Sequence, residues 1–399
     1  MSEQPALRGM AWDHPRARHP LEAIAAQWSM ERGVRVQWDA RPLKYFEDQP
    51  LEELATAYDL VLIDYPFVGT AAKSGLISPV DSFVDAAYLA DQAAHSVGPS
   101  YASYTWAGRQ WALAIDAACQ VSAVREDLWS AGEHGSRPDS WPDVAQLARR
   151  TRRAASRVAI ALNPNHAYCA FLAVGVCLAG MHFWPTGSQL DRPAAEESLV
   201  LLRRLATQVH PVSRDADPIT ISDLMTRSDE ILYVPLMFGY SSYARQGFRA
   251  HVLRFDDAPR GPSGIRGSVL GGVGLALSTR SRQCADAADL ARRIASPDAQ
   301  SGIYAQSGGQ PGHAAAWDSS SVNAQTGNFF RATRATIEQA FMRPRVPGHR
   351  EFQPLAGQRI HRFIWGEQED SAMCVADFLR LADSLLADRN AAPSFEESQ

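Results

Sequence analysis

The sequence predicts an α/β fold in which strands alternate with helices around a layered sheet. Residues 7–12 form a short apolar run, residues 19–28 follow with helical spacing, and residues 34–38 alternate between apolar and polar side chains as a strand does. Residues 58–65 are almost continuously apolar, which is typical of a strand buried on both faces of a parallel sheet. This order favours parallel strands joined by crossover helices.

The later chain continues the alternation. We expect a strand at 111–115, a turn of small residues at 116–119 and a second extended segment at 120–124. Ser140, followed by Pro142, has the chemistry of a helix N-cap. The remaining expected elements are a helix at 126–132, strands at 158–162, 231–238 and 269–277, helices at 168–181, 196–208 and 284–294, long helices up to about residue 387, and a frayed tail over 391–399.

Composition excludes several classes of protein. Of the 399 residues, 46% are hydrophobic and 21% charged, which is ordinary for a chain with packed cores and excludes wholesale disorder. The formal net charge of −5 gives no reason to expect nucleic-acid binding. The longest apolar stretch, residues 167–181, contains two glycines and falls short of a membrane span, so no membrane insertion is expected.

The cysteines and histidines indicate neither a disulfide framework nor a metal site. The five cysteines are widely spaced without a CxxC pair, and the eleven histidines form no HxH or HxxxH pair. The glycine-rich run at 271–274 lacks both the P-loop ending and the dinucleotide fingerprint. We therefore expect no metal and no cofactor.

Four stretches carry a family resemblance: YDLVLIDYPFVGTAAKSGLISPVDSFV, GRQWALAIDAACQVSAVREDLWSAGEHGSRPDSWPDVAQLAR, VLGGVGLALSTRSRQCADAADLARRIASPDAQ and SGGQPGHAAAW. Together they resemble the extracellular solute-binding proteins of ABC transporters, in particular the carbohydrate type with the two-lobed periplasmic-binding-protein (type II) fold. The resemblance implies a hinge and a ligand cleft between two α/β lobes, and we expect a monomer. It places lobe one at 1–114 plus 268–318 and lobe two at 115–267 plus 319–390.

The resemblance also bears on partner and compartment. The start of the chain has no basic segment followed by an apolar run, so it does not read as a secretory leader. We expect a cytoplasmic protein as the sequence stands, and a periplasmic one, with an ABC permease as partner, if a leader was removed.

Polar residues that follow predicted strands are the candidate ligand contacts, because ligands gather beyond the carboxyl ends of strands in such sheets. A carboxylate beside an aromatic ring supplies the mixed chemistry that a polyol needs. The candidates next to expected strands are Trp12, Asp13, His14, Asp64, Tyr65, Asn163, His166, Tyr240 and Ser241. Asn165 and Tyr243 lie in the same loops. Asp116 is added because it lies at the expected crossing, and Gln310, His313 and Trp317 because they follow a glycine turn, where the Trp317 ring could stack on a ligand.

Two functions fit these residues. The first is a solute-binding protein that closes on a small, polar, carbohydrate-like ligand. The alternative is a cytoplasmic hydrolase or transferase on the same fold, with Cys119, Asp64, Asp116 and His14 as catalytic candidates. Cys119 lies just past the first expected crossing, a position similar to that of the nucleophile in thiaminase I, although AIDAACQVSA does not match that family's motif well.

Overall fold

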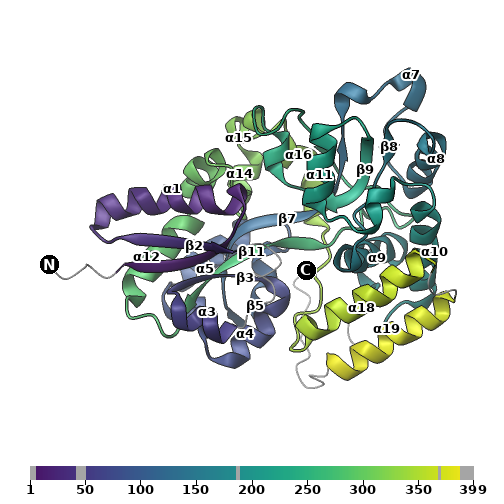
Figure 1. Cartoon of the computed structure of the whole chain (residues 1–399). Helices are drawn as coiled ribbons and strands as arrows, with labels where there is room; N and C mark the ends of the chain where they lie inside the picture. Colours follow the sequence, from purple (N-terminus) through teal and green to yellow (C-terminus); the bar gives the residue numbers. More distant parts are fainter. Residues whose placement is uncertain (1–5, 42–50, 186–188, 367–369, 387–399) are drawn as a thin grey trace.

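One long strand, β7 (Leu113–Val124), runs through both halves of the molecule and organises the fold (Figure 1). Its first half pairs antiparallel with β11 (Leu270–Ser278), and its second half pairs antiparallel with β9 (Ile231–Phe238). The partner strand changes between Cys119, which lies opposite Leu270, and Gln120, which lies opposite Phe238. The computed structural model, which describes residues 6–41, 51–185, 189–366 and 370–386, therefore has two α/β lobes joined through a shared sheet.

The strand order of this sheet shows how the first lobe is built. The order is β2-β1-β3-β11-β7-β9-β8, with β10 beside β7 and β4 beside β11. β1 pairs in parallel with β2 and β3, which confirms the predicted crossover arrangement of the first strands. The other strands are β1 (Leu7–Trp12), β2 (Val36–Arg41), β3 (Leu60–Asp64), β4 (Ile77–Ser78), β8 (Arg157–Val158), β10 (Arg254–Asp256) and the small hairpin β5 (Thr105–Trp106) and β6 (Arg109–Gln110).

The turn expected at residues 116–119 is wrong, because the backbone continues through these residues as one strand. The glycines of β11 that lie opposite this part of β7 allow the strands to pack closely. A Cβ added to Gly272 would lie 2.2 Å from the Asp116 carbonyl oxygen, and one added to Gly271 would lie 2.8 Å from the Phe238 ring. The ladders on both sides satisfy the backbone, so a strand is favoured over a turn.

The helices surround the two halves of the sheet (Figure 1). Those before β7 are α1 (Pro15–Arg32), α3 (Leu51–Ala57), α4 (Val68–Ser74), α5 (Ala86–His95) and α6 (Ser100–Ser103). Those between β7 and β11 are α7 (Ala131–His134), α8 (Trp141–Thr151), α9 (Pro164–Ala179), α10 (Arg192–Ala206) and α11 (Pro218–Arg227). Those after β11 are α12 (Cys284–Ala295), α13 (Pro297–Ala299), α14 (Ala314–Asp318), α15 (Ser320–Gln325), α16 (Phe329–Ala332), α17 (Arg334–Glu338), α18 (His349–Ile364) and α19 (Ser371–Leu385).

Several of these elements test the sequence predictions. The N-cap at Ser140 is confirmed: its side chain accepts from the Asp143 backbone N–H, and the Asp143 side chain completes a capping box. The helix expected at 126–132 is instead a short 3-10 turn followed by α7, and the strand expected at 158–162 ends at Val158. After residue 312 the chain first forms four short helices, α14 to α17, in place of the expected long ones, and only α18 and α19 are long.

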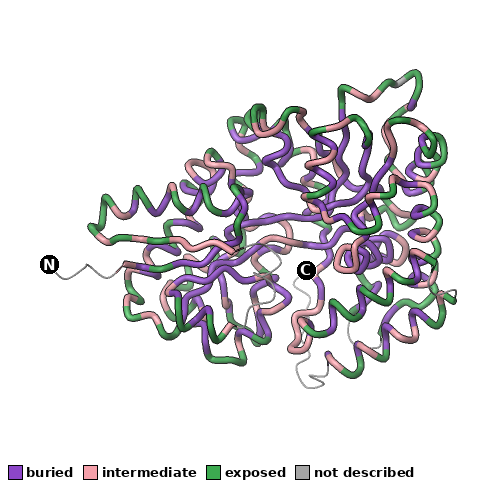
Figure 2. Tube along the Cα trace, in the orientation of Figure 1, coloured by how far each residue is buried: buried purple, intermediate pink, exposed green. Residues whose placement is uncertain are grey.

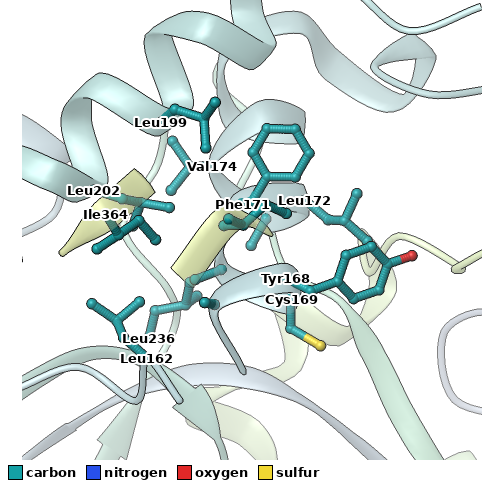
Figure 3. Packing of buried hydrophobic residues seen from close by; sticks show 14 of the residues in the cluster. Leu162, Tyr168, Cys169, Phe171, Leu172, Val174, Leu199, Leu202, Leu236 and Ile364 are labelled. Carbon is teal, nitrogen blue, oxygen red and sulfur yellow. The ribbon is translucent and has the colours of Figure 1, made fainter. Parts of the chain in front are cut away.

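The core of the second lobe is built around α9 (Figure 3). Tyr168, Phe171 and Val174 of this helix pack among aliphatic side chains from α10, α18 and β9. In length and composition the segment Pro164–His182 could also cross a membrane, but 67% of its apolar window is buried inside the protein. Burial by the surrounding helices therefore accounts for its apolar composition. Figure 2 shows the same contrast across the molecule, with buried central strands and α9 and with exposed outer faces on α18 and α19.

Three chain segments lie together where the lobes join. The first is the partner change in β7. The second is the return to β11, where Ser268 donates its hydroxyl to the Gln120 carbonyl oxygen at 2.7 Å. The third precedes α18, where the Phe341 N–H donates to the Ser268 carbonyl oxygen at 2.7 Å and Phe341 accepts from the Leu270 N–H at 2.9 Å. These hydrogen bonds hold the three segments side by side.

Candidate functional site

Two acidic side chains lie in one row across the sheet where the lobes join. Asp64, the last residue of β3, is the register partner of Val273 on β11, and Val273 is in turn the partner of Asp116 on β7. Register partners share a face of a sheet, and two strand spacings separate these residues by about 10 Å. The row contains the two carboxylates that the sequence placed at strand ends.

Asp116 forms a buried ion pair with Arg16 of α1. The Arg16 Nε–Asp116 Oδ2 distance is 2.8 Å and the Nη2–Oδ1 distance is 2.5 Å, a two-pronged geometry. Both side chains are almost fully buried, with 4% and 1% of their surfaces exposed. Arg16 also donates to the Gly239 carbonyl oxygen at 3.3 Å and lies 4.7 Å from the Tyr240 ring centroid. A residue of α1 thus joins β7 to the tip of β9.

The connection from β1 to α1 positions this arginine. His14 is the N-cap of α1, and its Nδ1 accepts a hydrogen bond from the Arg16 backbone N–H at 3.1 Å. The His14 ring meets the edge of the Tyr240 ring at 5.1 Å. Burial lowers the pKa of His14 to about 4, and the positive charge of Arg16 acts in the same direction. At neutral pH His14 is therefore an uncharged ring against Tyr240.

Gln310 fastens the tip of β9 to β7. Its side-chain nitrogen donates to the carbonyl oxygens of Ala117 at 2.9 Å and Gly239 at 3.2 Å, and its side-chain oxygen accepts from the Ser241 N–H at 3.0 Å. The side chain is 1% exposed. Gln310 and Ser241 therefore lie beside Tyr240, as a shared site requires, but Gln310 uses its amide to hold backbone in place.

Asp64 has its own buried arginine, Arg343, from the third crossing segment. The Arg343 Nη2 lies 3.3 Å from Asp64 Oδ2, and the exposed fractions of the two side chains are 6% and 15%. Arg343 also donates to the Tyr65 hydroxyl oxygen through its backbone N–H at 2.9 Å and its Nε at 3.1 Å. The Tyr65 hydroxyl donates to the Leu270 carbonyl oxygen at 3.2 Å. Tyr65 thus connects β3 to the other two crossings.

A chain of polar contacts continues from Arg343 into the second lobe. Its Nη1 donates to the Gln353 side-chain oxygen at 2.9 Å, and the Gln353 amide contacts the Asn165 side chain at the start of α9. Asn163 caps this helix by accepting from the His166 N–H at 3.0 Å, and the His166 ring lies against Phe238 at 6.0 Å. The route from Asp64 to Asn165 therefore crosses from one lobe to the other.

The electrostatics of the row are balanced by pairing. Burial raises the pKa of both Asp64 and Asp116 above the usual range of a carboxyl, while Arg343 and Arg16 respectively oppose that shift. Burial lowers the pKa of His166 to about 4, so this ring is neutral at pH 7. The result is a charge-compensated set of donors and acceptors at the lobe junction, with aromatic rings beside it.

Four expected contacts lie elsewhere, and the structure corrects those expectations. Asp13, which precedes α1, is exposed and pairs with Arg18 of that helix at 3.2 Å. Trp12 is 4% exposed in the core of the first lobe. Trp317 is 1% exposed, with its indole N–H donated to the Pro311 carbonyl oxygen, so its face is not available for stacking on a ligand.

His313, the fourth, caps α14 and stacks on His95 at 5.6 Å. Asp91, His95 and His313 bring potential metal-ligating atoms within 4.8 Å of one another. The Nδ1 of His313 accepts from the Ala315 N–H at 3.2 Å, so in the neutral ring the proton lies on Nε2. A protonated Nε2 has no lone pair for a metal, and the cluster fits an ion poorly.

The environment of Cys119 opposes the catalytic interpretation. The side chain is 3% exposed within β7, and burial raises the pKa of its thiol far above the usual value. A nucleophilic cysteine needs the opposite shift, from a cation or a histidine that stabilises the thiolate. Cys119 is a small buried side chain in the core.

Three residues of the site were missed from the sequence. Arg16, Arg343 and Gln353 lie in or before helices, and nothing in their local sequence distinguishes them from surface residues. The DHPRARHP segment contains two arginines, of which Arg16 is buried and Arg18 exposed. Only the packing of α1 against β7 and β9 separates them.

Comparison with known proteins rests on structure alone. No protein-family model matches the chain, and no curated protein matches it in sequence. Among solved structures, the chain is similar to maltose-bound MalE3 of T. maritima, with 17% identity, a TM-score of 0.81 and coverage of 96% of this chain and 100% of that one. It is also similar to an ABC transporter solute-binding protein of Agrobacterium radiobacter K84 in complex with ribitol, with 16% identity, a TM-score of 0.78 and coverage of 95% and 98%.

A third similar structure is an ABC transporter solute-binding protein of Thermotoga lettingae TMO bound with α-D-tagatose, with 15% identity, a TM-score of 0.77 and coverage of 96% and 99%. These likenesses extend over nearly the whole of each chain. They agree with the two lobes, the shared sheet and the crossing segments described above. The chain therefore has the two-lobed α/β fold of the ABC-transporter solute-binding proteins.

Proposed function

We propose that this protein is a solute-binding protein that binds a small polar, carbohydrate-like ligand between its lobes. The observation that carries the proposal is Asp64 at the lobe junction, whose side chain remains 15% exposed beside Arg343, while the enclosed Arg16–Asp116 pair fixes the neighbouring strand β7. Carboxylate and guanidinium groups in fixed orientations form paired hydrogen bonds with neighbouring hydroxyls, which is the recognition that a polyol requires.

The aromatic groups support the same ligand class. Tyr240 and His14 lie together beside Asp116, and the His166 and Phe238 rings lie together in the second lobe. Both histidines are neutral at pH 7 because their pKa values are about 4. Ring faces beside charged hydrogen-bonding groups suit the alternating apolar and hydroxyl surfaces of a sugar.

The relatives in fold extend the proposal to partners. The three described above are bound to maltose, ribitol and α-D-tagatose, and two are described as parts of ABC transporters. An ABC permease is the partner that this function implies, with the lobes closing on the ligand before transfer.

Direct binding is the test. Native mass spectrometry of freshly purified protein detects a retained small molecule. In parallel, a thermal-shift assay measures the melting temperature of the protein with maltose, α-D-tagatose or ribitol added. A ligand that binds only the folded state raises the melting temperature. Failure of the retained-ligand search together with no shift from any polyol or sugar would contradict the proposed class.

A variant pair locates the site. Asp64→Asn removes the charge without changing the side-chain size, and it should weaken binding by about 1–3 kcal/mol, or roughly 5- to 150-fold in Kd. Asp13→Asn is the matched control, because Asp13 is an exposed carboxylate whose partner, Arg18, is also exposed. Equal affinity of the two variants would remove Asp64 from the site.

A further inference from the structure

A separate cavity lies at the edge of the lobe junction. It has a volume of about 450 Å³ and is lined by Pro15 and His19 of α1, by Ser242, Arg245 and Phe248 after β9, and by residues 306–308. We call it the seam cavity. α1 belongs to the half of the sheet that contains β1, and the 242–248 segment follows β9, so the lining comes from both lobes.

The charged groups that line the seam cavity are positive only. None of its lining residues is acidic, and Arg245 contributes a guanidinium. Among the described residues no carboxylate lies within ion-pair distance of Arg245, and its buried Nε has no hydrogen-bond partner. Its Nη2 donates to the Ala305 carbonyl oxygen at 2.5 Å, which orients the group without neutralising it.

Neighbouring arginines of the same segment are paired. Arg249 donates to Asp223 at 2.9 Å, and Arg254 lies 3.3 Å from Asp256. Of these three arginines, only Arg245, which lines the cavity, has no carboxylate partner among the described residues. A partly buried cation without a counter-ion is costly, and burial correspondingly lowers the pKa of the Arg245 guanidinium.

The remaining lining residues carry hydrogen-bond donors and one aromatic ring. The hydroxyls of Ser242 and Ser307, the amide of Gln306 and the His19 ring supply hydrogen-bond donors around the guanidinium. The Phe248 ring gives one apolar wall. The volume is large enough for a small organic molecule rather than a single ion.

We propose that the seam cavity is a second ligand site that binds a small molecule carrying a carboxylate or phosphate group, with Arg245 as its counter-ion. The cavity borders the sugar-type site, since Pro15 and Ser242 of its lining adjoin His14 and Ser241 in the chain, but its lining contains neither Asp64 nor Asp116. Because its walls come from both lobes, an anion bound there stabilises their present arrangement. By thermodynamic linkage, any ligand that favours the same arrangement of the lobes strengthens anion binding, and the bound anion strengthens binding of that ligand by the same factor.

Calorimetric titration of the full chain tests the proposal, with inorganic phosphate and succinate as separate probes at constant ionic strength. Sodium chloride at the same ionic strength measures simple screening. Saturable binding of phosphate alone identifies a phosphate receptor, binding of succinate alone a carboxylate receptor, and both results support the oxyanion site. No saturable binding of either probe up to millimolar concentration overturns it.

Variants connect the binding to the cavity. Arg245→Gln should weaken binding of the responding probe tenfold or more, whereas Arg18→Gln, which removes an arginine paired with Asp13 and Glu22, should change it less than twofold. Gln306→Glu is the second variant: it places a negative charge at an exposed lining position and should abolish binding without disturbing the core. Unchanged binding in Gln306→Glu contradicts the proposal even where Arg245→Gln fails to fold.

A competition experiment separates the two proposed sites. Sugar binding should persist in Arg245→Gln, and anion binding should persist in Asp64→Asn. Mutual displacement of the sugar and the anion would show that the seam cavity is part of the sugar site and would overturn the second site. Loss of sugar binding alone would count against the proposed function and leave the anion site standing.

Discussion

Removal of the Asp116 carboxylate should destabilise the folded protein strongly. Asp116→Ala leaves the Arg16 guanidinium in a site where 4% of its side chain is exposed, with a backbone carbonyl at 3.3 Å and the Tyr240 ring as its remaining contacts. Breaking a buried ion pair by removing one partner typically costs about 3–5 kcal/mol, because the other charge stays buried without compensation. We expect a loss of that size in the free energy of unfolding.

The measurement is urea unfolding, comparing midpoint and slope for each variant. Asp13→Ala is the matched control, since its exposed pair with Arg18 should contribute about 0–1 kcal/mol. The double variant Arg16→Met with Asp116→Leu removes both charges and should recover most of the lost stability, because apolar side chains often replace a buried pair at little cost.

The comparison of the single and double variants shows whether the uncompensated charge of Arg16 causes the loss of stability. A loss below about 1 kcal/mol for Asp116→Ala would refute the reasoning, because a buried and uncompensated guanidinium cannot be that inexpensive. A double variant as unstable as the single one would also refute it. That result would mean that packing, and not charge compensation, determines stability at this position.

Three further predictions follow from burial. The pKa of His14 is about 4 in the folded protein and 6.5 for the free side chain, so the unfolded chain binds the proton first as the pH falls. The free energy of unfolding should therefore decrease by up to about 3 kcal/mol as the pH drops from about 6.5 to about 4. His14→Asn keeps the N-cap acceptor and should flatten this part of the stability–pH profile. A thiol reagent should modify exposed Cys284 in the native protein and leave Cys119 untouched, with all five cysteines reacting after denaturation; modification of native Cys119 would contradict its burial. Gly312→Ala places a Cβ 2.1 Å from a backbone carbonyl oxygen of β7 and should lower the free energy of unfolding by about 3 kcal/mol, measured by thermal or urea unfolding. Gly132→Ala is the control, because its Cβ meets only a side chain at 3.9 Å and should be tolerated. Equal melting temperatures of the two variants would show that the backbone around Gly312 relaxes.

Local sequence predicted the strands and helices where periodicity was strong. The bounds of β1 and β9 are those expected, and α9 and α12 lie close to the expected helices, because their apolar residues recur with the period of the element. The error at residues 116–119 has a different origin. A run of small residues permits either a turn or tightly packed strands, and the choice depends on whether β11 and β9 lie alongside.

The candidate site was predicted in part. Strand-end position found Asp64, since the end of an apolar run is visible in the sequence, whereas Asp116 was chosen at an expected turn that is in fact the interior of β7. It gave no information about their partners, because Arg16 and Arg343 reach them from segments 100 and 279 positions away along the chain. Trp317 shows the opposite failure: an aromatic residue after a glycine turn suggests a ligand contact, yet the late short helices enclose it in the core.

The sequence by itself determined the α/β class, the alternation of elements and the strand end at which Asp64 occurs. These features depend on local periodicity and on where an apolar run stops. Only the tertiary structure decided which charges are buried together, which aromatic rings belong to the core, and that Arg245 faces a cavity without a counter-ion. Such properties arise from contacts between segments far apart in the chain, and burial, which sets the cost of a charge and the direction of a pKa shift, exists only once those segments have packed.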